Sequence, residues 1–142
     1  MGGARDERCT VAKRARFSSG SSFERDIGYS RVVIDGDYAF VSGTTGFDYA
    51  TMTISESTVE QAQQACENIA QALAAAGTSL ANVVRVRYIV PNVADFEPCW
   101  PTLRRFFGEA LPAATMISAG LSDPRMKIEI EVTARIDQRN AS

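Results

Sequence analysis

The sequence predicts an α+β fold in which a mixed β-sheet carries two helices on one face. Three observations support this: two β-rich runs joined by a tight turn over 31–42, a helical periodicity over 58–76, and a final run over 126–136 that alternates apolar and charged residues. With the elements between them, the order is β-β-α-β-α-β-β, which forms a two-layer sandwich. The 142 residues suffice for one domain with a sizeable core.

The first 22 residues predict a flexible N-terminal arm, and the folded domain is expected over residues 23–142. The arm mixes charged residues with Ser and Gly and shows no periodic apolar pattern. Residues 1–16 carry a net charge of +3, whereas the whole chain carries −2. We interpret this basic segment as a disordered leader, because a nucleic-acid-binding domain concentrates its basic charge on the folded surface.

The first two strands are expected at Arg31–Ile34 and Tyr38–Ser42. The Asp35-Gly36-Asp37 segment between them is typical of a hairpin turn. Ser42-Gly43-Thr44-Thr45-Gly46 follows, and its glycines allow the backbone to bend or to approach a ligand closely. This segment is not a phosphate loop, because the Gly-Lys-Ser/Thr ending is missing.

The first helix is predicted from Ser57-Thr58-Val59-Glu60, which has capping-box spacing, to a stop at Gly77. Apolar residues recur between them at helical intervals, at Ala62, Cys66, Ile69, Ala70, Leu73 and Ala76. Because Cys66 lies on this apolar stripe, we interpret it as a core residue rather than a nucleophile.

The second helix is predicted to begin at a cap on Asp95 and to run to about Phe107. Pro98 suits its first turn, and Pro101 predicts a kink or a restart. Between the two helices, Val83–Val90 predicts a strand with Arg85 and Arg87 on one side. The residues expected on its other side are Val84, Val86 and Tyr88.

The last two strands are expected at Thr115–Ala119 and at about Met126–Ile136, separated by a turn over 122–125. In the final strand the isoleucines and Val132 share one face, and Glu129 and Glu131 share the other. Two readings stay open for this acidic face: an ordinary solvated side of the sheet, or one wall of a wet cleft. Because the two helices cover a single face, oligomerisation is the natural cover for the other.

Composition excludes several classes of function. The chain contains no histidine, so it can build neither a Ser-His-Asp or Cys-His catalytic group nor a histidine-ligated metal site. Acid-base chemistry must come from carboxylates, Tyr, Lys, Cys or water. Cys9, Cys66 and Cys99 form no CxxC pair, and no apolar run has the length of a membrane span. We therefore expect a reduced, cytoplasmic protein with no metal, no cofactor and no membrane partner.

The order and spacing of several short motifs resemble the Rid family of reactive-intermediate (imine/enamine) deaminases, also known as the YjgF or L-PSP endoribonuclease family. The resemblance covers about residues 27–137. Its motifs are Gly28-Tyr29, Ser42-Gly43, the Gly77 helix stop, Asp95-Phe96, Phe106-Phe107, Pro112-Ala113 and the strand 127–131. The resemblance implies a chorismate-mutase-like fold and a homotrimer whose three sheets form a central barrel, with clefts for small molecules at the subunit interfaces.

The resemblance also implies site residues. In deaminating members a glutamate positions or activates the water that attacks the C=N carbon, and here Glu129 matches it. Tyr29 matches a pocket tyrosine, and Ser42 with Gly43 supplies the backbone of the pocket.

The chain departs from the family at the substrate anchor. Ala114 stands where an arginine binds the substrate carboxylate, Met116 stands at the usual cysteine position, and Trp100 replaces an asparagine. These residues, together with Thr115, are expected to give a larger and more apolar pocket. Arg31 and Arg87 are candidate replacement anchors.

Three functions follow, and the sequence leaves them open. The first is hydrolysis of an imine, enamine or related metabolite, with Glu129 as the base and Tyr29 as a hydrogen-bonding group. Its structural alternative is a Glu129 that merely pairs with Lys127 or an arginine. The second is a noncatalytic trimer that binds an uncharged or aromatic metabolite, for which Trp100 and Ala114 speak, although Trp100 also suits ordinary helix packing. The third, an endoribonuclease or translation inhibitor, fits least, because the body is acidic and lacks an aromatic and basic platform.

Overall fold

A computed structural model describes residues 14–136. The strands and helices of the described chain are β1 (Ala15–Phe17), α2 (Ser22–Ile27), β2 (Val32–Asp35), β3 (Tyr38–Thr44), β4 (Phe47–Asp48), β5 (Thr53–Ile54), α3 (Thr58–Ala75), β6 (Val83–Val90), α4 (Trp100–Phe107), β7 (Ala113–Ser118) and β8 (Glu129–Arg135). Short 3₁₀ turns lie at Leu80–Asn82, Val93–Asp95 and Glu97–Cys99.

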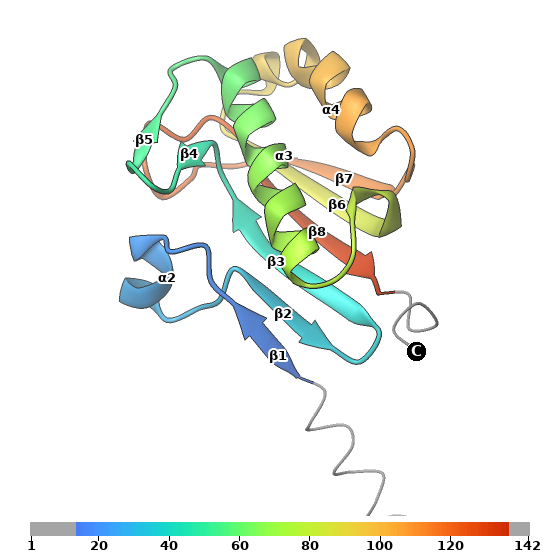
Figure 1. The fold of residues 1–142 in the computed structure, drawn as a ribbon. Helices are drawn as coiled ribbons and strands as arrows, with labels where there is room; N and C mark the ends of the chain where they lie inside the picture. Colours follow the sequence, from blue (N-terminus) through green and yellow to red (C-terminus); the bar gives the residue numbers. More distant parts are fainter. Residues whose placement is uncertain (1–13, 137–142) are drawn as a thin grey trace, which may run out of the picture.

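Six of the strands form one mixed sheet in the order β1-β2-β3-β8-β6-β7. Only the β6–β7 pair in this sheet is parallel. The last strand, β8, therefore lies in the middle, between β3 and β6. The helices α3 and α4 lie side by side on one face of the sheet, while β1 and β2 extend beyond α3 toward α2 (Figure 1). The α+β sandwich with two helices on one face is thus confirmed.

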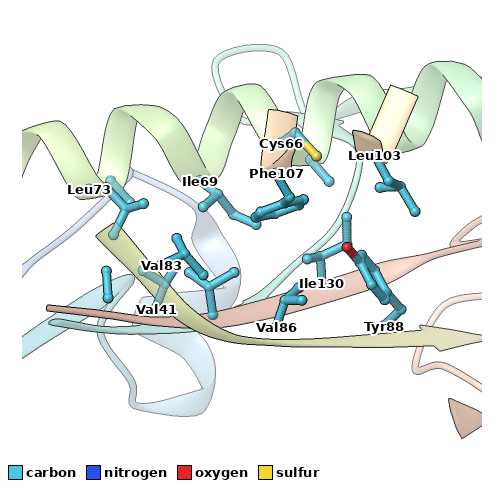
Figure 2. Packing of buried hydrophobic residues seen from close by; sticks show 14 of the residues in the cluster. Val41, Cys66, Ile69, Leu73, Val83, Val86, Tyr88, Leu103, Phe107 and Ile130 are labelled. Carbon is cyan, nitrogen blue, oxygen red and sulfur yellow. The ribbon is translucent and has the colours of Figure 1, made fainter. Parts of the chain in front are cut away.

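The core lies between the two helices and the sheet. Ile69 and Leu73 of α3 and Phe107 of α4 point down onto the sheet, where Val86 and Ile130 meet them (Figure 2). Cys66 belongs to the same cluster and is fully buried, as its place on the apolar stripe predicts. Burial raises the pKa of its thiol to about 12, so it is not a thiolate nucleophile at neutral pH.

The N-terminal boundary differs from the prediction. Residues 1–13 of the expected arm lie outside the described residues, but Ala15–Phe17 forms β1 and pairs antiparallel with β2, so the arm prediction is wrong there. Helix α2 also begins at Ser22, before the predicted boundary at residue 23. The Ser21 hydroxyl caps it by accepting a hydrogen bond from the Phe23 N–H.

Two local predictions in the middle of the chain were also wrong. Val84 is 45% exposed and does not share the buried face of β6, because a register irregularity between Val83 and Arg85 shifts it out of alternation. Asp95 does not cap the second helix: the Asn92 side chain caps a 3₁₀ turn there, and α4 begins later, at Trp100. The restart predicted at Pro101 is confirmed, since Pro101 lies in the first turn of α4.

The sheet face opposite the helices carries charged and apolar side chains in register. One row across neighbouring strands joins Phe40, Thr133, Arg85 and Ala113, and the next joins Glu131, Arg87 and Thr115. Phe40 is 46% exposed in the single chain. In the described part of the chain, no helix has the length and apolar character needed to cross a membrane.

Candidate functional site

Glu129 is the first residue of β8, on the face opposite the helices, and its side chain is not part of an ion pair. The two partners considered from the sequence are occupied elsewhere: Lys127 donates to the Glu56 carbonyl at 2.7 Å, and Arg87 pairs with Glu131 at 3.1 Å. Within residues 14–136 the Glu129 carboxyl has no hydrogen-bond partner. The reading of Glu129 as a paired sheet residue is therefore wrong.

Gly43 is placed directly against this carboxyl. It lies at an irregularity of the β3–β8 pairing, between Val41 and Thr44. A Cβ built on Gly43 would come within 2.5 Å of Glu129 Oε2 and 2.8 Å of its Cδ. The close approach expected of this glycine is real, and the group that approaches is the carboxyl of Glu129.

A pocket of about 280 Å³ lies beside Glu129. Tyr29, Arg31, Ser42, Gly43 and Tyr49 line it together with Glu129. The Ser42 hydroxyl donates to the Ser30 carbonyl at 2.7 Å, which fixes the wall of the pocket next to Tyr29. Glu129, Tyr29, Ser42 and Gly43, which lie far apart in the sequence, thus come together in one chain.

Arg31 forms the inner wall of this pocket and is only 3% exposed. Its Nε pairs with Glu24 of α2 at 3.3 Å, and its Nη1 donates to the Gly43 carbonyl at 2.9 Å and to Thr44 Oγ1 at 3.0 Å. The guanidinium lies 5.7 Å from the Tyr29 ring centre and 5.1 Å from that of Tyr49. The two aromatic rings and the ion pair together hold the guanidinium in place.

The Glu24–Arg31 pair is a buried ion pair supported by hydrogen bonds. Burial opposes ionisation of Glu24, but hydrogen bonds from Ser19 and Ser18 and the charge of Arg31 outweigh it, so the pKa of Glu24 lies below its usual value. Breaking one side of such a pair leaves an uncompensated buried charge. The wall of the pocket is therefore rigid.

The pKa of Glu129 is raised above that of an ordinary carboxyl. Burial is the largest cause, repulsion from Glu131 adds to it, and the charge of Arg31 acts against it. A carboxyl with a raised pKa holds a proton more readily than an exposed one. Such a group can take a proton from water and return it within one reaction.

The three predicted site residues on β7 lie away from this pocket. The register of β6 and β7 pairs Ala114 with Val86 and Met116 with Tyr88, so both share the face that carries the helices. Thr115 lies on the opposite face and accepts a hydrogen bond from Arg85 at 2.9 Å. Neither β7 nor α4 contributes a residue to the pocket beside Glu129.

Trp100 and Arg87 are likewise apart from Glu129. Trp100 packs edge-on against Phe96 with ring centres 6.3 Å apart and is 49% exposed, which fits the packing interpretation in part. Arg87 lies on the open face of β6, paired with Glu131. Of the two candidate replacement anchors, only Arg31 lines the pocket.

Sequence reasoning missed Tyr49 and Glu24. Tyr49 lies between the short strands β4 and β5, and burial raises its pKa; no local pattern indicates its place. Glu24 had a signal, because Ser21 and Glu24 have the Ser-x-x-Glu spacing of a capping box. The described residues include no group of three or more His, Cys, Asp or Glu placed to hold a metal ion.

The comparisons with known proteins identify the family and the fold. Residues 20–136 match the model of the family described as Endoribonuclease L-PSP. A crystal structure of a member of the YjgF/YER057c/UK114 family from Mycobacterium tuberculosis is 34% identical, with a TM-score of 0.79 over 87% of this chain and 99% of that one. A RutC family protein of Pyrococcus horikoshii is 31% identical over 75% of this chain and 85% of its own. A 2-iminobutanoate/2-iminopropanoate deaminase of Capra hircus is 29% identical over 75% of this chain and 78% of its own.

Proposed function

This chain belongs to the Endoribonuclease L-PSP family, which includes the Rid and YjgF proteins, and from that membership we propose that it hydrolyses a small imine or enamine with Glu129 as the general base. The observation that carries the proposal is the carboxyl of Glu129. It has no partner in the described chain, it has a raised pKa, and it faces a pocket lined by Tyr29 and Gly43.

The reaction needs one water molecule and one proton shuttle. Glu129 takes a proton from the water as its oxygen bonds to the carbon of the C=N group, and the π electrons of that group move to nitrogen. The protonated carboxyl then returns the proton to nitrogen, which gives the carbinolamine. In a second transfer the same carboxyl takes the hydroxyl proton and passes it to the amine nitrogen, the C=O bond forms, the C–N bond breaks, and ammonia and a carbonyl product leave. The single carboxyl of Glu129 acts first as the base and then as the acid. The reaction therefore needs no histidine, and the chain has none.

Tyr29 and Ser42 would orient the substrate beside this carboxyl. The phenol of Tyr29 can donate to a carbonyl or carboxylate oxygen, and its ring gives the pocket an apolar side. Gly43 keeps the Glu129 carboxyl close to the backbone, since any larger residue would displace it. Positioning of this kind contributes a large part of the rate in reactions of bound water.

The proposal includes a homotrimer with the clefts at subunit interfaces. In one chain Trp100, Ala114, Thr115 and Met116 lie away from Glu129, and the exposed sheet face with Phe40 and the Arg87–Glu131 pair is available for contact. A neighbouring copy would cover that face and bring its β7 toward the Glu129 pocket. Sedimentation equilibrium should then give three chains per particle.

The substrate of this site need not resemble a 2-imino acid. Arg31 cannot act as a two-pronged carboxylate clamp, because its Nε and Nη1 are held by Glu24, Gly43 and Thr44. Arg87 is paired with Glu131 outside the pocket. We therefore include imines without a carboxylate among the expected substrates, with Arg31 acting mainly through its charge.

The test is ammonia release from imines generated in place by amino-acid and amine oxidases. The wild type should accelerate release above buffer, and Glu129→Gln should lose about 10²-fold or more of that rate, because the base is gone. Glu131→Gln is the matched control, since it lies on the same face but is paired with Arg87. Rates equal to buffer over both classes of imine, or an unchanged rate in Glu129→Gln, would count against the proposal.

The second candidate function is a trimer that binds a metabolite without converting it. Ala114 favours it, because the chain retains the water-handling carboxyl but lacks the arginine that anchors substrate in deaminating members. Ligands of this kind would raise the melting temperature and be recovered unchanged. Ribonuclease activity has no supporting feature in the pocket, which offers no basic platform for RNA.

A further inference from the structure

A second and larger cavity lies on the other side of the Arg31–Tyr49 wall. It measures about 550 Å³ and is bounded by α3, by β1 and β2, and by the turn after β4. It exists because α3 lies over β3 and β8, whereas β1 and β2 extend past it with no helix of the described chain above them (Figure 1). We call it the helix-side cavity.

The wall formed by α3 is polar where packing against a sheet would favour apolar residues. Gln64, Asn68 and Gln71 follow each other at helical spacing and line the cavity as a row of amides. Asn68 is fully engaged: it donates to the carbonyls of Thr45 and Phe47, and it accepts from Gln64 at 2.9 Å. Gln71 is exposed at the edge of the cavity and Gln64 is half-buried, and the Gln71 amide and the Gln64 oxygen have no hydrogen-bond partner within residues 14–136.

Arg31 adds a buried positive charge to the same cavity. Its Nη2 donates no hydrogen bond to any described residue, since Nε and Nη1 make all the contacts of the guanidinium. Yet each fully buried side-chain nitrogen or oxygen of the described chain has a hydrogen-bond partner. Nη2 is therefore not fully buried, although the residue as a whole is 3% exposed, and the guanidinium borders both the helix-side cavity and the Glu129 pocket. An unused charged donor at the wall of a cavity is suited to an oxyanion.

The rest of the lining fits a small polar ligand. Val32 and Phe17 give an apolar floor from β2 and β1, and Asp48 lies at the exposed side of the cavity. A ligand here could place a carboxylate or phosphate oxygen against Arg31, use Gln71 for a further hydrogen bond, and lay its carbon atoms on Val32. Gln71 and Val32 take no part in the proposed attack of water, whereas Arg31 borders both sites.

We infer that the helix-side cavity binds a small oxyanion-bearing metabolite through Arg31 and Gln71, at a site separate from the Glu129 pocket. The two sites share the Arg31 guanidinium and the Tyr49 ring. Binding of a ligand at one site is therefore expected to change the affinity of the other site. The inference shares Arg31 with the proposed active site, but it does not need Glu129 to act as a base, because Gln71 and Val32 lie outside the Glu129 pocket.

The test is a titration of the ¹⁵N-labelled full chain with acetate, followed by NMR of the backbone amide, side-chain amide and arginine Nε resonances. Acetate should shift the signals of Gln71 and Arg31, and acetamide, which has the same shape without the charge, should shift them much less. A parallel titration with inorganic phosphate separates the two kinds of oxyanion: a response to acetate alone indicates a carboxylate, and a tighter response to phosphate indicates a phosphorylated ligand.

Gln71→Leu should weaken acetate binding about tenfold, as expected for one hydrogen bond to a charged group. Gln63→Leu is the matched control on the same helix, because Gln63 is exposed and lies outside the cavity. Shifts confined to Ser42, Gly43 and Glu129 would overturn the inference while leaving the proposed active site intact. An absence of any shift at Gln71 and Arg31 would overturn it as well.

Discussion

The Glu129 pocket and the edge strand β7 lie on the same sheet. Residues of a single chain line the pocket, whereas most side chains of β7 are exposed. The pocket joins residues from α2, β3, the β4–β5 turn and β8, and a buried ion pair fixes its wall. Along β7, five of the six residues are exposed, and the position of the family's anchoring arginine holds Ala114. One chain brings Glu129, Tyr29 and Gly43 together, whereas under the proposed assembly the residues of β7 would reach this pocket only from a neighbouring copy.

This difference has a physical basis. A carboxyl held against a backbone glycine and flanked by a buried guanidinium keeps its position with no ligand present. An edge strand with no partner on its free side presents unpaired backbone groups and exposed side chains. The residues that match the family are thus those that contact one another around Glu129. We expect substrate specificity to depend on the exposed residues of β7.

The largest expected effect is a difference in stability between variants of Arg31, in the pocket wall, and of Arg87, on the open face of the sheet. Arg31→Met should lower the free energy of unfolding by about 3–5 kcal/mol, because it leaves Glu24 charged and buried. Arg87→Met, which removes the half-exposed partner of Glu131, should cost about 1 kcal/mol or less. Urea denaturation of both variants at neutral pH measures the difference. Equal losses would mean that the wall of the pocket is no more fixed than the open face of the sheet.

Gly43→Ala should cost activity much more than stability. The added Cβ would meet the end of the Glu129 side chain, which can turn away cheaply, so the fold should lose about 1 kcal/mol or less. Displacing the base by about 1 Å should reduce the rate of ammonia release on the order of 10²-fold.

Gly120→Ala provides the control for this variant, because a Cβ at Gly120 meets no atom within 4 Å. The double variant Gly43→Ala, Glu129→Gln should be no slower than Glu129→Gln alone, since both changes remove the same base. A further loss in the double variant would show that Gly43 acts on the substrate directly.

Ala114→Arg tests whether a neighbouring β7 completes the pocket. If it does, the variant should hydrolyse carboxylate-bearing imines about tenfold faster than the wild type, as expected for one added charged hydrogen bond. Ala113→Arg places the same side chain on the opposite face of β7, by the register with Arg85, and should give no gain. The comparison is made as kcat/KM for ammonia release from 2-imino acids. A gain in both variants would point to a general charge effect rather than to placement.

The sequence predicts the strand that carries Glu129 better than it predicts the irregular and short strands of the sheet. The alternation in β8 places Ile130 and Val132 in the core and Glu129 on the opposite face, and the structure confirms it. Alternation failed at Val84, because a strand irregularity is a property of the pairing between β6 and β8 and leaves no mark on one strand alone. Short elements are equally hard to find: β1 has three residues, too few for any periodicity.

The composition of the site could be predicted only in part. Family spacing gave Glu129, Tyr29, Ser42 and Gly43, which the structure brings into one pocket. Tyr49 was missed because it reaches the pocket from a turn, through long-range packing on Arg31. A sequence position says which strand Ala114 belongs to, but its face follows from the parallel register with β6, and its partner follows from an assembly of chains.

The smallest expected effect is a pH dependence that belongs to Glu129 and has no counterpart on β7. Because the folded state holds the proton of Glu129 more tightly than the unfolded chain does, ionising this carboxyl works against folding. Its contribution to stability is complete below the unfolded pKa, near 4.3, and is lost as the pH rises through the higher folded value. Glu129→Gln cannot ionise, so its stability relative to the wild type should increase with pH across this interval and level off above it.

Thermal unfolding from about pH 4 to pH 8 measures this difference, with Glu109→Gln as the control, since Glu109 is exposed and lies outside the pocket. The rate of ammonia release should rise over the same interval, because the base must be ionised to take a proton from water. If the stability difference decreased with pH instead, Glu129 would be stabilised as a carboxylate, and its partner would have to come from a neighbouring chain. That outcome would mean that the environment of Glu129, like that proposed for β7, includes residues of a neighbouring chain.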